Sequence, residues 1–335
     1  MSVFIIAEAG ANHNRDLRQA FSLIDAAKEA GADAVKFQTY SSSTLYAKNA
    51  PDFAGYENIN KLIEEIELPR SWQGELKTYC DRTGIEFMST PFDEAAVKEL
   101  VDLGIKRLKI SGFESSDPRF VKMVASTGLP IIVSIGIGSN INSIEEVISW
   151  IGEVQANPDI TILHCNNAYP TPPEDINLNR IDNIVKKFPN IKVGLSDHTL
   201  GIAAPTLAVA KGVQCIEKHF TLSRRLPGPD HPFALEPEEL KCMVDNIRLA
   251  EVMCNDTDLV FTKSEAAFQK AMRSVVAKRN IRKGELLTED NLTTKRPRLE
   301  NSVSAKHFYK TIGQRALRFI EKDELIMVKD FEREI

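Results

Sequence analysis

The chain has 335 residues, of which 43% are hydrophobic and 27% are charged, and its net charge is −5. This composition is typical of a folded chain with a full core and excludes intrinsic disorder, while the net acidity argues against general nucleic-acid binding. No apolar run approaches the roughly 20 residues of a membrane-spanning helix, and the start of the chain lacks the basic segment of a secretory signal. Five scattered cysteines without a Cys-x-x-Cys pair predict reduced thiols, so we expect a cytoplasmic protein.

Up to about residue 222, short apolar runs alternate with amphipathic helices such as Leu17–Ala30, Glu94–Leu103 and Ile144–Ile151. The predicted strands are Phe4–Gly10, Ala34–Tyr40, Glu86–Thr90, Arg107–Ser111, Ile131–Ile135, Ile160–Cys165, Lys192–Asp197 and Cys215–Phe220. Eight such units predict an α/β fold, a closed (β/α)8 barrel of the TIM-barrel type. An open doubly wound sheet is the alternative, but the Gly-x-Gly-x-x-Gly pattern expected after its first strand is absent.

Two domains are expected from the length of the chain. A catalytic TIM barrel is predicted over residues 1–255, ending with a helix at Pro237–Cys254, followed by a linker at 256–272 and a small α+β domain at 273–335. In the small domain we expect short elements at Ser274–Ala277 and, after a cap at Thr288, at Glu289–Leu292. About 60 residues are near the lower limit for independent folding, so this domain is expected to lean on the barrel or on a second protomer.

The connection between the second and third predicted strands is unusually long, and residues 41–60 are rich in Ser, Asn, Pro and Gly. Insertions after the C-terminal end of a barrel strand often form a lid or a binding loop. A plain surface excursion is the alternative.

Polar side chains end all eight predicted strands. They are Glu8, Lys36, Gln38, Ser89, Thr90, Lys109, Ser111, Ser134, His164, Asn166, Asn167, Ser196, Asp197, His198, Glu217, Lys218 and His219. Catalysis in a TIM barrel takes place at this end of the strands, and ionisable groups in a barrel lumen are costly unless they are paired. We therefore expect an active site here, in which Lys36 and Lys109 are balanced either by Glu8 and Glu217 or by a substrate carboxylate or phosphate.

His198 and His219 end the seventh and eighth strands, which are neighbours in a closed barrel. Two imidazoles there could hold one divalent metal and leave positions open for substrate; a structural role for each histidine is the alternative. By strand alternation Asp197 points away from the lumen, so we expect it to support a ligand rather than to bind the metal. Asn14 is expected to cap the helix that begins near Asp16.

Taken in order, the strand-end motifs resemble those of the sialic acid synthase family of nonulosonic acid synthases. The matching stretches in the barrel are Ile6–Asn14, Lys36–Gln38, Ser89–Phe92, Lys109–Ile110 with Glu114, His164–Thr171, Gly194–Thr199, and Glu217–Thr221 with Gly228–Asp230. The tail looks like the antifreeze-like (SAF) domain of the family at Ser274–Ala277, Ile281–Glu285 and Lys295–Pro297. The resemblance covers essentially the whole chain.

The resemblance implies an enzyme that condenses phosphoenolpyruvate with N-acetylmannosamine or a related N-acetylated amino-deoxyhexose, giving a nine-carbon 2-keto acid and phosphate. It implies that Glu114, His198, His219, Lys36 and Lys109 are catalytic, with a divalent metal on the two histidines: Mn²⁺ in the first place, and Mg²⁺ or Co²⁺ as alternatives. The substrate-binding residues that it implies are Glu8, Gln38, Thr90, Ser134, Asn167, Tyr169, Ser196, Asp230 and Arg296. Arg296 would reach the partner's site in a domain-swapped homodimer.

Two positions depart from the family pattern: Gly112 stands where a phosphate-binding serine is usual, and Ile135 where threonine is usual. Both bear on how tightly phosphoenolpyruvate is held, and Ser111 or the amide of Gly112 could replace the missing hydroxyl. Three other functions stay open at this point. They are a legionaminate or pseudaminate synthase that uses a 2,4-diacetamido-trideoxyhexose, a catalytically silent sugar-binding homologue, and a metal-dependent aldolase that uses pyruvate.

Overall fold

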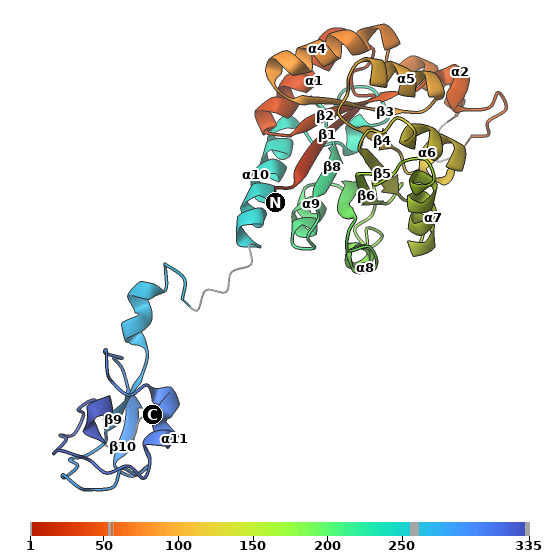
Figure 1. Ribbon diagram of the computed structural model, residues 1–335. Helices are drawn as coiled ribbons and strands as arrows, with labels where there is room; N and C mark the ends of the chain where they lie inside the picture. The colour runs from red at the N-terminus through yellow and green to blue at the C-terminus, as the bar shows by residue number, and fades with distance from the viewer. Residues whose placement is uncertain (1, 53–54, 56, 255–260, 332–335) are drawn as a thin grey trace. The chain divides into compact units, whose positions relative to one another are not determined.

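The chain folds into two compact units, Met1–Asn255 and Asp256–Ile335 (Figure 1). The computed structural model describes residues 2–52, 55, 57–254 and 261–331, so residues 256–260 of the predicted linker lie outside the described residues. None of the described helices is both long enough and apolar enough to cross a membrane.

Eight parallel strands form a nearly closed barrel in the first unit (Figure 1). They are β1 (Phe4–Gly10), β2 (Ala34–Thr39), β3 (Glu86–Pro91), β4 (Leu108–Ile110), β5 (Ile131–Ile135), β6 (Ile160–Cys165), β7 (Lys192–Asp197) and β8 (Cys215–His219). The hydrogen-bonded order is β3-β2-β1-β8-β7-β6-β5-β4, so the first and last strands pair and, in the described barrel, only the β3–β4 junction lacks a ladder. The predicted TIM-barrel fold is confirmed.

Helices surround the strands. They are α1 (Leu17–Ala30), α4 (Gln73–Thr83), α5 (Glu94–Asp102), α6 (Pro118–Ala125), α7 (Ile141–Gly152), α8 (Asn179–Lys187), α9 (Ala203–Val209) and α10 (Pro237–Met253). The predicted capping role of Asn14 is wrong, because the side chain of Asp16 accepts the amide hydrogen bonds of Arg18 and Gln19 at the start of α1. Asn14 has a positive φ of 48° in the preceding turn, and its Oδ1 lies 3.1 Å from Nε2 of His231.

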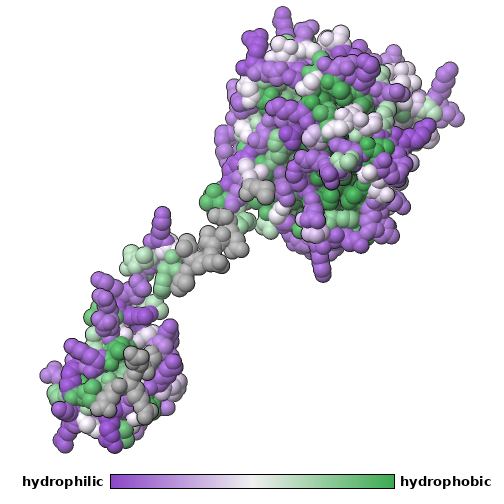
Figure 2. Space-filling model, viewed as in Figure 1, coloured by the Kyte–Doolittle hydropathy of each residue, from purple (hydrophilic) through white to green (hydrophobic). Residues whose placement is uncertain are grey.

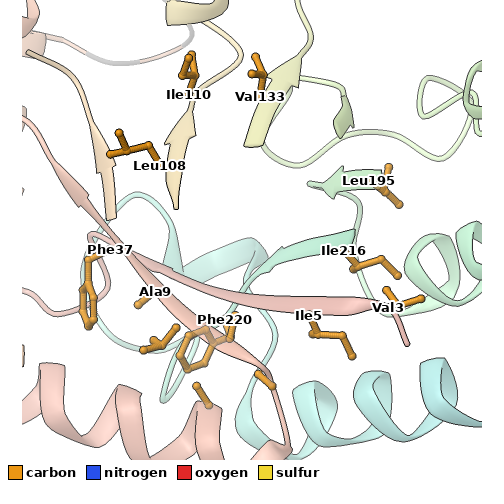
Figure 3. Packing of buried hydrophobic residues seen from close by; sticks show 14 of the residues in the cluster. Val3, Ile5, Ala9, Phe37, Leu108, Ile110, Val133, Leu195, Ile216 and Phe220 are labelled. Carbon is orange, nitrogen blue, oxygen red and sulfur yellow. The ribbon is translucent and has the colours of Figure 1, made fainter. Parts of the chain in front are cut away.

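Alternation along the strands divides the buried apolar side chains into two layers. Side chains such as Ile5, Val133 and Ile216 belong to the large core between the strands and the helices, whose packing Figure 3 shows. Side chains on the opposite face fill the lumen, namely Ile6, Ala34, Met88, Ile132, Leu163 and Cys215. This inner layer closes the barrel beneath the polar strand ends. Outside, hydrophilic residues cover most of the visible face of this unit (Figure 2).

The long connection between β2 and α4 contains two short helices, α2 (Ser42–Leu45) and α3 (Ile59–Ile66). Buried Tyr40, Ile59 and Ile63 form a small apolar cluster of their own, separate from the main core. The connection is therefore a folded element with its own packing at the C-terminal end of the barrel.

The second unit is a small domain around an antiparallel pair, β9 (Ser274–Ala277) and β10 (Leu292–Lys295), with one short helix, α11 (Phe308–Thr311). The expected element at Glu289–Leu292 is misplaced. Residues 288–291 form a turn, in which Oδ1 of Asn291 accepts the amide of Thr288, and the strand begins only at Leu292. The unit has a separate core made by residues such as Val275, Leu287 and Ile326.

Candidate active site

The register of the barrel brings the polar strand ends to one level. Glu8 on β1 is the pairing partner of both Lys36 on β2 and His219 on β8. In the same way Gln38 is level with Thr90, and Ser196 with Glu217. Residues that are far apart in the sequence therefore form one ring of polar groups above the apolar lumen.

Two lysines and two carboxylates form a buried ionic network at the centre of this ring. The Nζ atom of Lys36 lies 2.6 Å from Oε2 of Glu8 and 3.5 Å from Oε2 of Glu217. The Nζ atom of Lys109 lies 3.5 Å from Oε1 of Glu217. Hydroxyl groups add to it, because Thr90 accepts from Lys36 at 2.8 Å and Ser196 donates to Glu217 at 2.9 Å. Internal Lys–Glu pairing is thus present, and the cavity also keeps both ammonium groups at its floor.

The two carboxyl groups of the network have pKa values shifted in opposite directions, and so do its two lysines. Burial alone would raise the pKa of Glu217, but Lys109 and Lys36 outweigh burial and lower it to about 2. For Glu8, burial dominates over Lys36 and raises the pKa to about 7. Burial lowers the pKa of Lys109, whereas in Lys36 the carboxylates of Glu217 and Glu8 overcome burial and raise it. Glu217 is therefore the group of the network that keeps its charge over the widest pH range, and it lies 3.5 Å from Nζ of both lysines.

His198, just after β7, and His219, at the end of β8, lie side by side with ring centroids 5.4 Å apart. Burial lowers the pKa of His198 to about 4 and that of His219 well below its usual range, so both are neutral imidazoles near pH 7. Nδ1 of His198 is hydrogen-bonded to the carbonyl of Asn166 at 2.6 Å. In the neutral ring Nδ1 therefore carries the proton, and the lone pair of Nε2 could bind a metal. Nδ1 of His219 is buried and has no hydrogen-bond partner among the described residues.

This pair fits a divalent metal, because neutral imidazole is a common metal ligand and one buried nitrogen lacks a partner. In the described part of the chain no group of three or more His, Cys, Asp and Glu side chains is arranged to hold a metal ion. A metal here would therefore have two protein ligands and take its remaining ligands from substrate and water.

Aromatic rings enclose the histidines on one side. The ring of Tyr169, on the loop after β6, lies 4.2 Å from that of His198 and 6.1 Å from that of His219, between centroids. Phe233, on the loop after β8, lies 5.2 Å from the ring of His219. Tyr169 also lines the cavity, so its ring forms part of the wall beside the two imidazoles.

Glu114 lies in the loop after β4, where its carboxylate accepts a hydrogen bond from the hydroxyl of Ser111. Burial raises its pKa, so it can exchange a proton closer to neutral pH than an exposed glutamate can. Because Ser111 is engaged with Glu114, it does not replace the serine that is missing at position 112.

The side chain of Asn167 lies close to Gly112 and leaves little space for a larger residue there. A Cβ atom at Gly112 would lie only 2.9 Å from both terminal atoms of the Asn167 side chain, and one at Gly136 would overlap its Oδ1. This Oδ1 accepts the amide hydrogen of Ile137 at 3.0 Å. Asn167 thus occupies the space that a serine at position 112 would need. The other departure, Ile135, is buried in the core outside the strands and does not line the cavity.

Asp230 reaches the site from the loop after β8. Its Oδ2 lies 3.7 Å from Nδ1 of His219, and burial raises its pKa to about 6. Buried His231 anchors the loop, because Nδ1 is hydrogen-bonded to the hydroxyl of Thr221 at 2.6 Å and Nε2 to Asn14 at 3.1 Å. Gln38 on β2 donates to Oε1 of Glu8 at 2.9 Å.

One cavity of about 470 Å³ brings these groups together. It is lined by every site residue that the sequence indicates in the barrel unit: Glu8, Lys36, Gln38, Thr90, Lys109, Glu114, Ser134, Asn167, Tyr169, Ser196, His198, Glu217, His219 and Asp230. Arg296 belongs to the second unit, where it is exposed just after β10. The cavity also has an apolar side, made by Tyr40, Leu45, Tyr46, Ile59, Leu62, Ile63, Ile66, Phe92 and Phe113. Leu45, Tyr46 and Ile59 belong to residues 41–60, for which a lid or binding loop is the prediction from the sequence.

Other polar strand-end residues point away from the cavity. Ser89 is hydrogen-bonded to Thr39, and Nε2 of His164 to the carbonyl of Ile176, both on the outer side of the strands. Asp197 also points outward, as alternation predicts, but it does not contact His198 as a supporting group. The carbonyl of Asn166 has that role.

Asp197 forms a second buried ion pair behind the histidines. Nζ of Lys218 lies 2.5 Å from Oδ2 of Asp197 and also donates to the carbonyl of Thr199. Thr199 in turn donates its amide to Oδ1 of Asp197 at 3.0 Å. Because these residues flank His198 and His219 in the chain, the pair ties the two histidine-bearing strand ends together from behind.

Lys218→Met is expected to lower the free energy of unfolding by about 3–5 kcal/mol, because it leaves the buried carboxylate of Asp197 without a counter-ion. Lys192→Met is the matched control. Lys192 begins β7, the strand that carries Asp197, and pairs with Asp159 at 2.7 Å in an exposed position, so its loss is expected to cost only about 0–1 kcal/mol. Urea denaturation of both variants measures the difference, and equal losses would contradict the buried role of Lys218.

Comparison with known proteins agrees with this geometry. The NeuB family model matches residues 23–258, and the SAF domain model matches residues 272–332. The N,N'-diacetyllegionaminic acid synthase of Campylobacter jejuni is 39% identical over 331 residues, which cover 96% of this chain and 98% of that protein. A pseudaminic acid synthase of Campylobacter jejuni is 36% identical over 339 residues, which cover 98% of this chain and 96% of that protein.

A solved structure is similar as well. The N-acetylneuraminic acid (sialic acid) synthetase of Leptospira borgpetersenii, in complex with citrate, superposes with a TM-score of 0.73 at 33% identity, over 80% of this chain and 90% of that one. The family match covers most of the barrel, and the relatives span nearly the whole chain. The protein therefore belongs to the NeuB family, with a SAF domain after its barrel, and its homologues are nonulosonic acid synthases.

Proposed function

We propose that this protein is a nonulosonic acid synthase, a transferase that joins phosphoenolpyruvate to an N-acetylated amino-sugar aldehyde through a new C–C bond. The acceptor is N-acetylmannosamine or a related amino-deoxyhexose, and the products are a nine-carbon 2-keto sugar acid and phosphate. The observation that carries the proposal is the cavity in which two buried lysines, Glu114 and the His198–His219 pair face one another. Relatives named as legionaminic and pseudaminic acid synthases support the reaction class.

Phosphoenolpyruvate, with its carboxylate and its phosphate, complements the floor of this cavity. Lys36 and Lys109 provide two ammonium groups, and burial strengthens their attraction for a bound anion because the local dielectric is low. Ser134 has a buried hydroxyl with no partner among the described residues, so it can donate to a bound anion without losing another bond. The hydroxyls of Thr90 and Ser196 and the amide of Asn167 complete the proposed grip on the two anionic groups.

In the proposed reaction, carbon 3 of phosphoenolpyruvate attacks the aldehyde carbon of the open-chain sugar, and the aldehyde oxygen takes up a proton. Water adds to carbon 2, which then breaks its bond to the phosphate oxygen and becomes the ketone of the product. Glu114 moves protons at this second stage, with the hydroxyl of Ser111 holding its carboxylate in place. Glu8, Gln38 and Asp230 orient the sugar hydroxyls.

A divalent cation held by His198 and His219, Mn²⁺ in the first place, would supply Lewis-acid polarisation of the sugar aldehyde. Two features favour binding of such a cation. Burial keeps both imidazoles neutral, and the hydrogen bond to the carbonyl of Asn166 orients the ring of His198.

The proposal is tested by measuring phosphate release from the purified full-length protein. Release is expected only when phosphoenolpyruvate, an N-acetylated amino-sugar and a divalent metal are all present. Pyruvate in place of phosphoenolpyruvate is expected to give no product. Consumption of pyruvate, or binding of sugar without any phosphate release, would refute the proposed reaction.

Glu114→Gln is expected to lower kcat about 10²- to 10⁴-fold, because the amide keeps the shape of the side chain but cannot exchange a proton. The KM for phosphoenolpyruvate should change little, since the lysines that bind it are intact. Glu94→Gln, an exposed change in the first turn of α5, is the matched control and should keep the wild-type kcat. An unchanged kcat in Glu114→Gln would remove Glu114 from the proposed proton transfer.

His198→Ala is expected to weaken Mn²⁺ binding more than about a hundred-fold, since loss of an outer-shell partner alone typically costs 10- to 100-fold. Free Mn²⁺ in a titration, measured by electron paramagnetic resonance, reports this affinity without any turnover. His307→Ala in the second unit is the control and should bind Mn²⁺ as the wild type does. Full Mn²⁺ affinity in His198→Ala would exclude the proposed ligand pair.

We extend the proposal to a domain-swapped homodimer in which Arg296 contacts the N-acyl group of the sugar at the partner's site. Arg296→Ala should then raise the KM for the sugar about ten-fold or more, the usual effect of losing a hydrogen bond to a charged group, and leave the KM for phosphoenolpyruvate unchanged. Light scattering should give twice the chain mass of 37.4 kDa. A fully active monomer would contradict this assembly.

A further inference from the structure

The active-site cavity has two chemically different parts. Its floor carries the ionic network and the histidines, whereas its other side is made by the connection between β2 and α4 together with neighbouring aromatic residues. We call this side the apolar wall and define it as Tyr40, Leu45, Ile59, Leu62, Ile63, Ile66 and Phe92. The proposed chemistry uses the floor and leaves the wall without a role.

The apolar wall consists largely of one face of helix α3. Ile59, Leu62, Ile63 and Ile66 share one face of α3, at the spacing of an amphipathic helix, while Lys61, Glu64 and Glu65 are exposed on the other face. Ile59 and Ile63 are buried, whereas Leu62 and Ile66 are only partly buried and line the cavity. Leu62 and Ile66 thus present aliphatic surface to whatever fills this part of the site.

Polar contacts hold the connection in place. The amide of Ser42 donates to Oε2 of Glu67 at 2.8 Å, and the side chain of Asn60 donates to the carbonyl of Ala47 at 3.0 Å. The rings of Tyr40 and Phe92 meet edge to face, with centroids 5.6 Å apart. A wall fixed in this way can discriminate between ligands, because it does not have to be ordered when a ligand binds.

The wall adjoins the groups that the proposed function assigns to the sugar. Tyr40 follows Gln38 by two residues. Tyr40, Asp230 and Glu8 line the same cavity. The aldehyde carbon must reach carbon 3 of phosphoenolpyruvate at the floor. The opposite end of the sugar chain therefore points toward the wall.

Charge excludes an anionic group at that end. Among the described residues that line the cavity, the lysines are Lys36 and Lys109, and both are engaged at the floor with Glu8 and Glu217. The ionisable groups nearer the rim are the carboxyls of Glu114 and Asp230. A phosphate on the far end of the acceptor would meet acidic and apolar side chains of the barrel there, and the described lining residues include no further lysine or arginine to balance it.

We infer that the acceptor is an uncharged, N-acylated deoxyaldose whose methyl end packs on the apolar wall, and that Leu62 and Ile66 of α3 determine this specificity. The inference rests on the proposed function and narrows its acceptor from the wider group of amino-sugars to those that carry a methyl group at the end opposite the aldehyde. A terminal hydroxyl would lose its water against the side chains of Leu62 and Ile66, which offer it no hydrogen-bond partner.

The experiment compares kcat/KM for three acceptors with the same protein, phosphoenolpyruvate and Mn²⁺. They are a 2,4-diacetamido-2,4,6-trideoxyhexose, N-acetylmannosamine, and N-acetylmannosamine 6-phosphate. The deoxy sugar is expected to be preferred over N-acetylmannosamine by about ten- to a hundred-fold, the range by which an apolar pocket discriminates against an added hydroxyl. The phosphorylated sugar should be the poorest substrate.

Variants of α3 then test whether Leu62 and Ile66 determine the preference for the deoxy sugar. Leu62→Asn should bring the ratio of kcat/KM between the deoxy sugar and N-acetylmannosamine close to one, and Ile66→Gln provides an independent test should the first variant fold poorly. Lys61→Gln, on the exposed face of α3, is the matched control and should keep the wild-type ratio. Thermal unfolding of each variant distinguishes a local change from a loss of fold.

The possible outcomes distinguish a failure of the inferred acceptor specificity from a failure of the proposed synthase function. Phosphate release that is fastest with N-acetylmannosamine or its 6-phosphate would overturn the inference and leave the synthase function intact. So would a wild-type ratio in both Leu62→Asn and Ile66→Gln. A preference for the deoxy sugar that both variants abolish supports it. Absence of phosphate release with every sugar would instead refute the synthase function.

Discussion

The candidate active site depends on one physical constraint, which is that two lysine side chains buried inside a barrel need carboxylates beside them. Burial works against the charge of Lys36 and Lys109, and the network balances it with a carboxylate placed between them. Glu217 can be that carboxylate because β8 is hydrogen-bonded to β1 and β7, which sets Glu217 level with Ser196 and next to Glu8 and Lys36 in the ring. A barrel that closes through β1 and β8 is therefore a requirement of this electrostatic arrangement, since a sheet left open at that edge would separate the two halves of the network.

Strand alternation lets two adjacent strand ends serve two purposes. On β7 and β8 the cavity side carries Ser196, Glu217 and His219, and the outer side carries Asp197 and Lys218. The outward pair is buried between the strands and the helices, where its attraction is strong because little water competes with it. It fixes the separation of the strand ends from behind, while the carbonyl of Asn166 fixes the ring of His198 from the side. The position of the two imidazoles thus comes from contacts that a ligand never touches.

Periodicity and motif spacing were sufficient to predict the barrel and to place its polar strand ends in one site, because both follow from local pattern and from the fixed topology of the fold. The apolar wall was not predictable in this way. Its helix α3 has only eight residues, and its apolar face becomes meaningful only when Tyr40 and Phe92 from two strand ends pack against it. The cap of α1 was misassigned for a related reason. Asn14 and Asp16 are equally good capping residues in the sequence, and the positive φ of Asn14 and Arg15 decides which one stands at the helix start.

The two departures from the family pattern have different physical meanings once side chains are placed. Ile135 follows Ser134 on β5, so it faces the helices, and a larger apolar side chain there adds to the outer core without changing the cavity. Gly112 is coupled to Asn167, whose side chain lies against both Gly112 and Gly136. A Cβ at position 112 would come within 2.9 Å of the end of the Asn167 side chain, so a serine there would require Asn167 to shift. The residue at position 112 and the orientation of Asn167 are therefore linked, which is a property of the pair and of neither residue alone.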